Sequence, residues 1–290
     1  MKTKNLILGF ALSLTILSCN KEENGSPISS ADAKAGAQID AMNDDVSNVV
    51  EEQEASTYAT PTTGKMADSG VSELTTCATI TRVPAFGTLP TVGQTVTKTI
   101  NYGTGCTLSS GNVVSGVIVI TFVYQPDATS HTINYSFENF THNGIAFNGN
   151  KTFTRTMVTT ATNPNLHPQV TMTLDLTATI PGVGTYHRVG TRVREFIDGY
   201  GDEILTNNIY KITGSWVTTT PSGAVQNSEI TTPLRVKMSC LTLNKALIVS
   251  GIITITRADT SGTLDFGDGD CDNLAVFTVN GNSYNIIIGN

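Results

Sequence analysis

The sequence predicts an all-β domain over residues 71–290, either an antiparallel β-sandwich or a long meandering sheet. Short runs rich in Thr, Val, Ile, Tyr and Phe alternate there with turns that contain Gly, Pro and Asn, which is the pattern of successive strands. Asn-Gly dipeptides stand between several of the runs, and they favour the turns that fit the twist of a hairpin. Four cysteines in the same region predict two disulfides that staple the sheet.

Alternation along single runs supports these strands. In "TMTLDLTATI" (171–180) the apolar residues share one face against Thr and Asp, as a strand with one buried face requires. Hairpin turns are expected at 143–144, 148–149 and 280–281, where Asn-Gly occurs.

Residues 1–18 are typical of a secretory signal peptide. Lys2 and Lys4 precede an apolar run from Leu6 to Leu17, and small Ser18 follows it. The run is too short for a stable transmembrane helix, and no second such run occurs downstream. We therefore expect the chain to be exported.

The residues around Cys19 resemble the lipobox of bacterial lipoproteins, since Ile, Leu and Ser directly precede this cysteine. The resemblance implies that Cys19 becomes the lipidated first residue of the mature chain and holds the protein on a membrane through its acyl chains. The stretch 21–23, Lys-Glu-Glu, is similar to the export signal of Bacteroidota lipoproteins. It implies an outer-membrane protein that faces the cell exterior, and a solvated charged linker is the alternative.

Residues 19–70 are expected to form an acidic tether with one short amphipathic helix at about 37–55. The segments on either side of this helix have the composition of flexible linkers. The apolar residues of the helix fall near helical spacing: Ile39, Met42, Val46, Val49 and Val50. Residues 20–70 hold ten acids and three bases, whereas residues 71–290 hold fourteen acids and twelve bases. A nearly neutral domain without a basic stripe argues against nucleic acid as a partner.

The five cysteines give an even number once Cys19 is assigned to lipid. The remaining four, Cys77, Cys106, Cys240 and Cys271, allow three pairings, and sequence alone does not choose between them. The two neighbouring pairs enclose segments of similar length that close on related text, "NYGTGC" and "DFGDGDC". We therefore predict the disulfides Cys77–Cys106 and Cys240–Cys271. A zinc site is disfavoured because no Cys-x-x-Cys or nearby histidine supplies its ligands.

Two echoes suggest either an internal duplication or recurrent strand-and-turn solutions. "VVSGVIVIT" (113–121) matches "IVSGIITIT" (248–256), and the two cysteine-containing loops also match. The order of strand and loop is reversed between the halves, which weakens a simple tandem repeat.

Longer stretches extend the resemblance. "NYSFENFTHNGIAFNG" (134–149), "YKITGSWV" (210–217), "ITTPLRVKMSC" (230–240) and "LDFGDGDCDN" (264–273) are similar to uncharacterised lipoproteins of Bacteroidota of a flavobacterial type. This resemblance covers much of the mature domain and implies no activity.

One motif has the composition of a calcium site. Calcium needs six to eight oxygen ligands, and the loop "DFGDGDCDN" offers four alternating carboxylates, Asp265, Asp268, Asp270 and Asp272. An EF-hand is excluded because Val279 stands where its twelfth-position Glu belongs. A structural turn beside the disulfide is the alternative, so calcium is possible and no other cofactor is expected.

Catalytic patterns are weak. The strand "YHRVGTRVREFIDGYGDEI" (186–204) places Arg and aromatic side chains on one face, followed by three acids in a turn, a pattern that fits sugar or partner binding, or simply a solvated strand. Trp216, with Tyr200 and Tyr210 nearby in sequence, is either core or sugar platform. Four scattered histidines form no recognisable triad or metal motif.

The expected function is therefore that of an outer-membrane lipoprotein that binds a glycan or protein ligand, or supports the envelope, without catalysis. The enzymatic question stays open. A hydrolase with an unrecognised carboxylate site and a structural subunit of an envelope complex are the alternatives.

Overall fold

The computed structural model describes residues 28–58, 77–202 and 204–288. Cys19, the signal peptide and the Lys-Glu-Glu stretch lie outside the described residues. The elements are α1 (Ser30–Tyr58), β1 (Thr79–Val83), β2 (Thr95–Asn101), β3 (Cys106–Thr107), β4 (Val113–Val123), β5 (Ser130–His142), β6 (Ile145–Val158), β7 (His167–Ile180), β8 (Gly184–Asp198), β9 (Ile209–Thr219), β10 (Val225–Lys237), β11 (Ile248–Arg257), β12 (Thr260–Asp268), β13 (Leu274–Val279) and β14 (Asn282–Ile287), with short 3₁₀ helices at Leu205–Asn207 and Met238–Leu243.

The strands form one antiparallel sheet, in which neighbours in the chain are neighbours in space. Its order is β1-β2-β4 and then β5 to β14 in sequence, with β3 beside β4. Of the two predicted alternatives, the protein therefore has the meandering sheet. Both predicted disulfides, Cys77–Cys106 and Cys240–Cys271, are confirmed.

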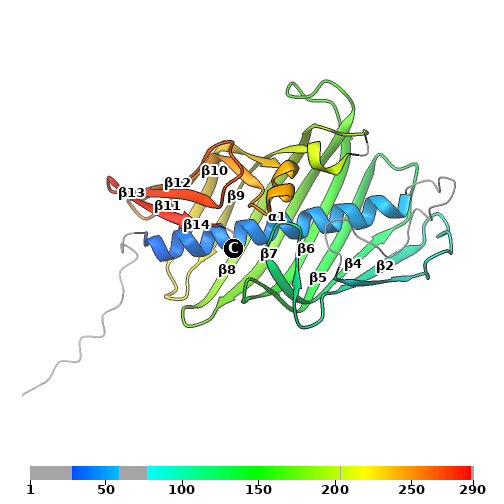
Figure 1. Ribbon diagram of the computed structural model, residues 1–290, viewed down its shortest axis with the longest axis horizontal. Coiled ribbons are helices and arrows are strands. Elements are labelled where there is room, and N and C mark those ends of the chain that lie inside the picture. Colours follow the sequence, from blue (N-terminus) through cyan, green and yellow to red (C-terminus); the bar gives the residue numbers. More distant parts are fainter. Residues whose placement is uncertain (1–27, 59–76, 203, 289–290) are drawn as a thin grey trace, which may run out of the picture.

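Helix α1 lies across one face of the curved sheet (Figure 1). It is longer at both ends than the predicted 37–55, and most of its residues are buried, polar ones included. The helix is thus part of the core instead of an amphipathic element on the tether. A helix that is buried on nearly all sides cannot show the single apolar stripe of a surface helix.

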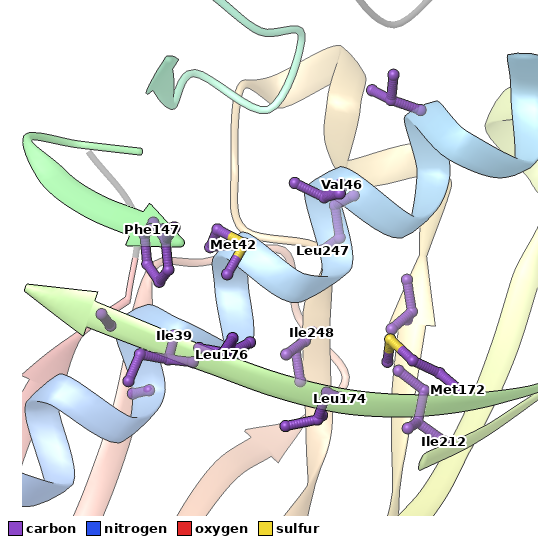
Figure 2. Packing of buried hydrophobic residues seen from close by; sticks show 14 of the residues in the cluster. Ile39, Met42, Val46, Phe147, Met172, Leu174, Leu176, Ile212, Leu247 and Ile248 are labelled. Carbon is purple, nitrogen blue, oxygen red and sulfur yellow. The ribbon is translucent and has the colours of Figure 1, made fainter. Parts of the chain in front are cut away.

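The core lies between α1 and the inward face of the sheet. Figure 2 shows Ile39 and Met42 of α1 near Leu176 of β7 and Phe147 of β6, and Val46 near Leu247. The alternation predicted for 171–180 holds, since Met172, Leu174, Leu176 and Ala178 are all buried. The inward side chains of β7 meet apolar residues of the helix.

Two of the three predicted Asn-Gly turns are confirmed, and one is wrong. Residues 143–144 and 280–281 join consecutive strands, with positive φ at both members of each pair. Residues 148–149 lie inside β6 instead. A Cβ on Gly149 would come within 2.3 Å of the Asp175 carbonyl oxygen, so this glycine permits a close approach between strands.

The echoed glycines have a common physical role. Gly116 of β4 and Gly251 of β11 both have positive φ, at 84° and 109°. A Cβ on Gly116 would come within 2.3 Å of the Asn139 carbonyl oxygen, and one on Gly251 within 2.6 Å of that of Pro233. Both face irregular positions in the neighbouring strand, and glycine kinks of this kind let a sheet curve around its contents.

Candidate functional site

The inward face of the sheet carries basic side chains that meet acids of α1. Arg257 and Tyr186 contact Asp32, with Nη2 to Oδ2 at 2.7 Å and Oη to Oδ1 at 3.0 Å. Near the middle of the helix, Arg188 and Arg192 both donate to Asp40. Buried charges are tolerated in proteins where they are paired. The acidic side chains of the helix therefore match the basic side chains on the inward face of the sheet.

The pairing continues toward the end of the helix. His131 Nδ1 and Arg155 Nη1 lie 3.0 and 3.3 Å from the two oxygens of Glu54. Lys98 Nζ donates to the Gln53 carbonyl oxygen at 2.6 Å. The hydrogen bond to Glu54 raises the pKa of His131, so this imidazole is held in its charged form more strongly than an isolated one.

The Arg-rich face of β8 is therefore internal. Arg188, Arg192 and Arg194 are buried, whereas Val189 on the opposite face is 44% exposed. Trp216 is buried against the guanidinium groups of Arg188 and Arg192, at 4.9 and 4.2 Å from the ring centre. Of the two interpretations of Trp216, core residue or sugar platform, the structure supports the core residue.

Asp44 differs from the other helix acids. Within the described part of the chain, neither of its carboxylate oxygens has a hydrogen-bond partner. Burial raises the pKa of Asp44 to about 7, against an opposing effect of Arg194. A cavity of about 20 Å³ adjoins it, which is room for one water molecule.

The four predicted calcium ligands are exposed and are not brought together. Asp265 and Asp272 accept hydrogen bonds from backbone groups of their own turn, Gly267 N and Leu274 N. Lys237 Nζ donates to the Gly269 carbonyl oxygen at 2.7 Å. Within the described ranges, no three His, Cys, Asp or Glu side chains gather so as to hold a metal ion. These contacts are those of a structural turn.

The turn acids after β8 also hold local structure. Asp198 accepts from Gly199 N at 3.0 Å, and Asp202 accepts from Ile204 N at 2.9 Å and from Asn207 Nδ2 at 2.6 Å. Glu203 lies outside the described residues. Each histidine pairs with a carboxylate on a different element, an arrangement that sequence spacing did not indicate: His131 with Glu54, His142 with Asp45, His167 with Glu195, and His187 with Asp175.

An aromatic hollow of about 190 Å³ opens between the last turns of α1 and the ends of β8 and β9. Three aromatic side chains line it, and the Phe196 ring centroid lies 5.3 Å from that of Tyr200 and 4.5 Å from that of Tyr210. Its charged lining residues, Glu51 and Glu52 of α1 and Arg155 of β6, are its polar wall. The lining residues of this aromatic hollow are Asn48, Glu51, Glu52, Ala55, Arg155, Pro168, Phe196, Tyr200, Leu205, Asn208, Tyr210 and Met238.

A second, wider hollow of about 420 Å³ lies on β8 to β11. Its side chains are mainly hydroxyls and amides, with Glu229 and two exposed valines, Val189 and Val217. The Trp216 ring stacks on Arg188 and Arg192, so it offers this outer hollow no free aromatic platform.

Of the sugar-platform residues considered from sequence, Tyr200 and Tyr210 are thus brought together and Trp216 is not. The helix residues of the aromatic hollow were missed, because nothing in the sequence shows which strand loops the end of α1 meets. No protein-family model matches the chain, and comparison with the curated proteins and with solved structures finds no match either. Among the described residues, no helix has the length and apolar character needed to cross a membrane.

Proposed function

We propose that this protein is a lipoprotein of the outer membrane that faces the cell exterior, is anchored through a lipid on Cys19, and binds a ligand or supports the envelope without catalysis. The observation that carries the proposal is the run from signal peptide to Cys19, followed directly by Lys-Glu-Glu. The disulfides support it, because such bonds persist in oxidising compartments outside the cytosol.

A lipid on Cys19, as proposed, would be joined to the domain through α1. Ile28, the first described residue, is nine residues after Cys19, a separation that spans at most roughly 32 Å. Since α1 begins at Ser30 and is held by ion pairs inside the sheet, a lipid on Cys19 would be attached to the core through the helix. We infer that the N-terminal end of α1 would then lie within that distance of the membrane.

Basic and aromatic groups of the concave face hold α1, so this face is filled by the protein's own helix. A ligand would therefore bind elsewhere, and among the described residues two hollows at the surface have room for one.

Protease shaving of intact cells tests the outward orientation. We expect the wild-type domain to be removed from intact cells, and a variant with Lys21, Glu22 and Glu23 all changed to Ala to be protected until the outer membrane is opened. Full protection of the wild-type protein would place the domain on the inner side and contradict the proposal.

A further inference from the structure

We propose that the aromatic hollow binds one neutral hexose ring of a glycan. A hexose ring has an apolar face of C–H groups and a rim of hydroxyls, so it needs an aromatic surface on one side and hydrogen-bonding groups at the edge. The hollow has both, because its lining includes the aromatic rings of Phe196 and Tyr200 as well as the carboxylates of Glu51 and Glu52 of α1.

The aromatic wall is accessible and firmly placed. Tyr200 is 43% exposed, and its ring meets Phe196 edge to face. Phe196 in turn packs on the buried Tyr210, over which the Arg194 guanidinium lies at 3.6 Å. Edge-to-face pairs are a favoured geometry of aromatic rings, so these contacts stabilise the surface that Tyr200 offers to a ligand.

The polar wall retains hydrogen-bonding capacity. Glu51 accepts from Arg194 at 3.5 Å, and Arg155 pairs with Glu54 at 3.3 Å. A carboxylate has about four acceptor sites and a guanidinium five donors, so one ion pair leaves each group able to bind vicinal hydroxyls. With acids and a base both present, the wall suits an uncharged ligand better than an anion.

The volume sets the size of the ligand. Pockets for drug-sized ligands measure roughly 300–1,000 Å³, and the aromatic hollow of about 190 Å³ has room for a single ring. A ligand of that size binds with a dissociation constant on the order of 1 mM. Useful affinity on a cell surface would then come from many copies meeting a repetitive glycan.

The position of the aromatic hollow along α1 suits a glycan outside the cell. This inference about its orientation is the one step that depends on the proposed function. Ala55 is 25 residues beyond Ser30, which corresponds to roughly 37 Å along a helix. With the lipid attached before Ser30, the aromatic hollow opens at the end of the helix that points away from the membrane. The outer hollow lacks an aromatic platform, so we do not assign the sugar to it.

The test is saturation-transfer NMR on the purified full-length lipoprotein in a sugar-free detergent. Glucose, galactose, mannose and N-acetylglucosamine are offered separately at millimolar concentration. We expect at least one to give a signal that weakens about tenfold in Tyr200→Ala and is unchanged in Tyr284→Ala, whose tyrosine is also 43% exposed but lies on β14.

A second pair of variants covers a Tyr200→Ala protein that fails to fold. Glu52→Ala should weaken the same sugar, and Glu229→Ala, in the outer hollow, should not. A sugar signal that survives both Tyr200→Ala and Glu52→Ala, or that Glu229→Ala removes, overturns the assignment. The absence of a signal with all four sugars also overturns it, as expected if the hollow takes a side chain of a partner protein. Binding is measured on purified protein, so its failure is distinct from a failure of anchoring or export.

Discussion

Arg188 on β8 donates a hydrogen bond from Nη1 to Oδ1 of Asp40, near the middle of α1, at 2.5 Å, although 148 residues separate them in the chain. Arg192 donates to the same carboxylate. All three side chains are buried. Two guanidinium groups therefore share this one carboxylate, and the shared ion pair joins the helix to the sheet.

Replacing Asp40 with Ala should lower the free energy of unfolding by about 3–5 kcal/mol, because it leaves two buried cations without their partner. Urea denaturation measures the change. The matched control is Asp259→Ala at an exposed turn position, which we expect to stay within about 0.5 kcal/mol of the wild type. Equal effects of the two substitutions would show that the ion pairs do not hold the helix.

Replacing Asp44 with Asn should change how stability depends on pH. The pKa of Asp44 is raised from 3.8 to about 7 in the folded protein. Between these pH values the folded state keeps a proton that the unfolded state loses. The stabilising contribution of this proton to the free energy of unfolding is therefore complete below about pH 4 and is lost as pH rises through 7.

Urea midpoints at pH 5 and pH 8 therefore measure the effect of Asp44. We expect the wild type to lose up to a few kcal/mol of stability from this group over that interval. Asp44→Asn should lose less, and should be the more stable protein at pH 8. The Asp259→Asn control should lose as much stability between pH 5 and pH 8 as the wild type does. If Asp44→Asn also loses as much as the wild type, Asp44 does not carry the extra proton.

Removal of the disulfide between Cys240 and Cys271 should lower stability by about 3–4 kcal/mol on the loop-entropy account, since it closes a separation of 31 residues. The double variant Cys240→Ala and Cys271→Ala, compared in urea with the wild type under oxidising conditions, gives this value. Addition of a reductant should destabilise the wild type more than the variant, because it breaks two disulfides in the wild type and only Cys77–Cys106 in the variant. Identical midpoints for wild type and variant without reductant would contradict the prediction.

Gly116→Ala should be much more harmful than Gly144→Ala. Both glycines have positive φ, at 84° and 77°. A Cβ on Gly144 meets nothing within 4 Å among the described residues, whereas one on Gly116 would meet the Asn139 carbonyl oxygen at 2.3 Å. We expect about 1 kcal/mol of destabilisation from backbone strain at Gly144 and at least about 3 kcal/mol at Gly116, because a strand must move there. Similar thermal midpoints for the two variants would argue against the close approach of β4 and β5.

Local sequence signals predicted the fold class and the disulfide pairing. Alternation showed the buried face of residues 171–180, and related loop text suggested which cysteines pair. The same local signals failed at 148–149, because a glycine needed for a close approach between strands cannot be distinguished in sequence from one needed for a turn. They also gave no sign that Gly116 and Gly251, which the two echoed segments share, both pack closely against a neighbouring strand.

The candidate site was less predictable, because it depends on where α1 lies. Acids and bases were counted separately in the N-terminal and C-terminal parts, although many of them pair with one another across the helix and the sheet. The Arg face of β8 was expected to be open to solvent or ligand, and no signal within that strand shows that a distant acidic helix covers it. Tyr200 and Tyr210 lie near Trp216 in sequence, which suggests a sugar platform, but Glu51 and Glu52 join the two tyrosines only through the tertiary fold.

Lipidation of Cys19 is the claim on which the proposed function most depends. Cells that produce the protein can be fed an alkyne fatty acid, and the immunopurified protein can be examined for the label. We predict that the wild-type chain carries the label, fractionates with the outer membrane and loses both properties in Cys19→Ala. A wild-type chain without label, or a Cys19→Ala chain that still carries it, would contradict the anchor.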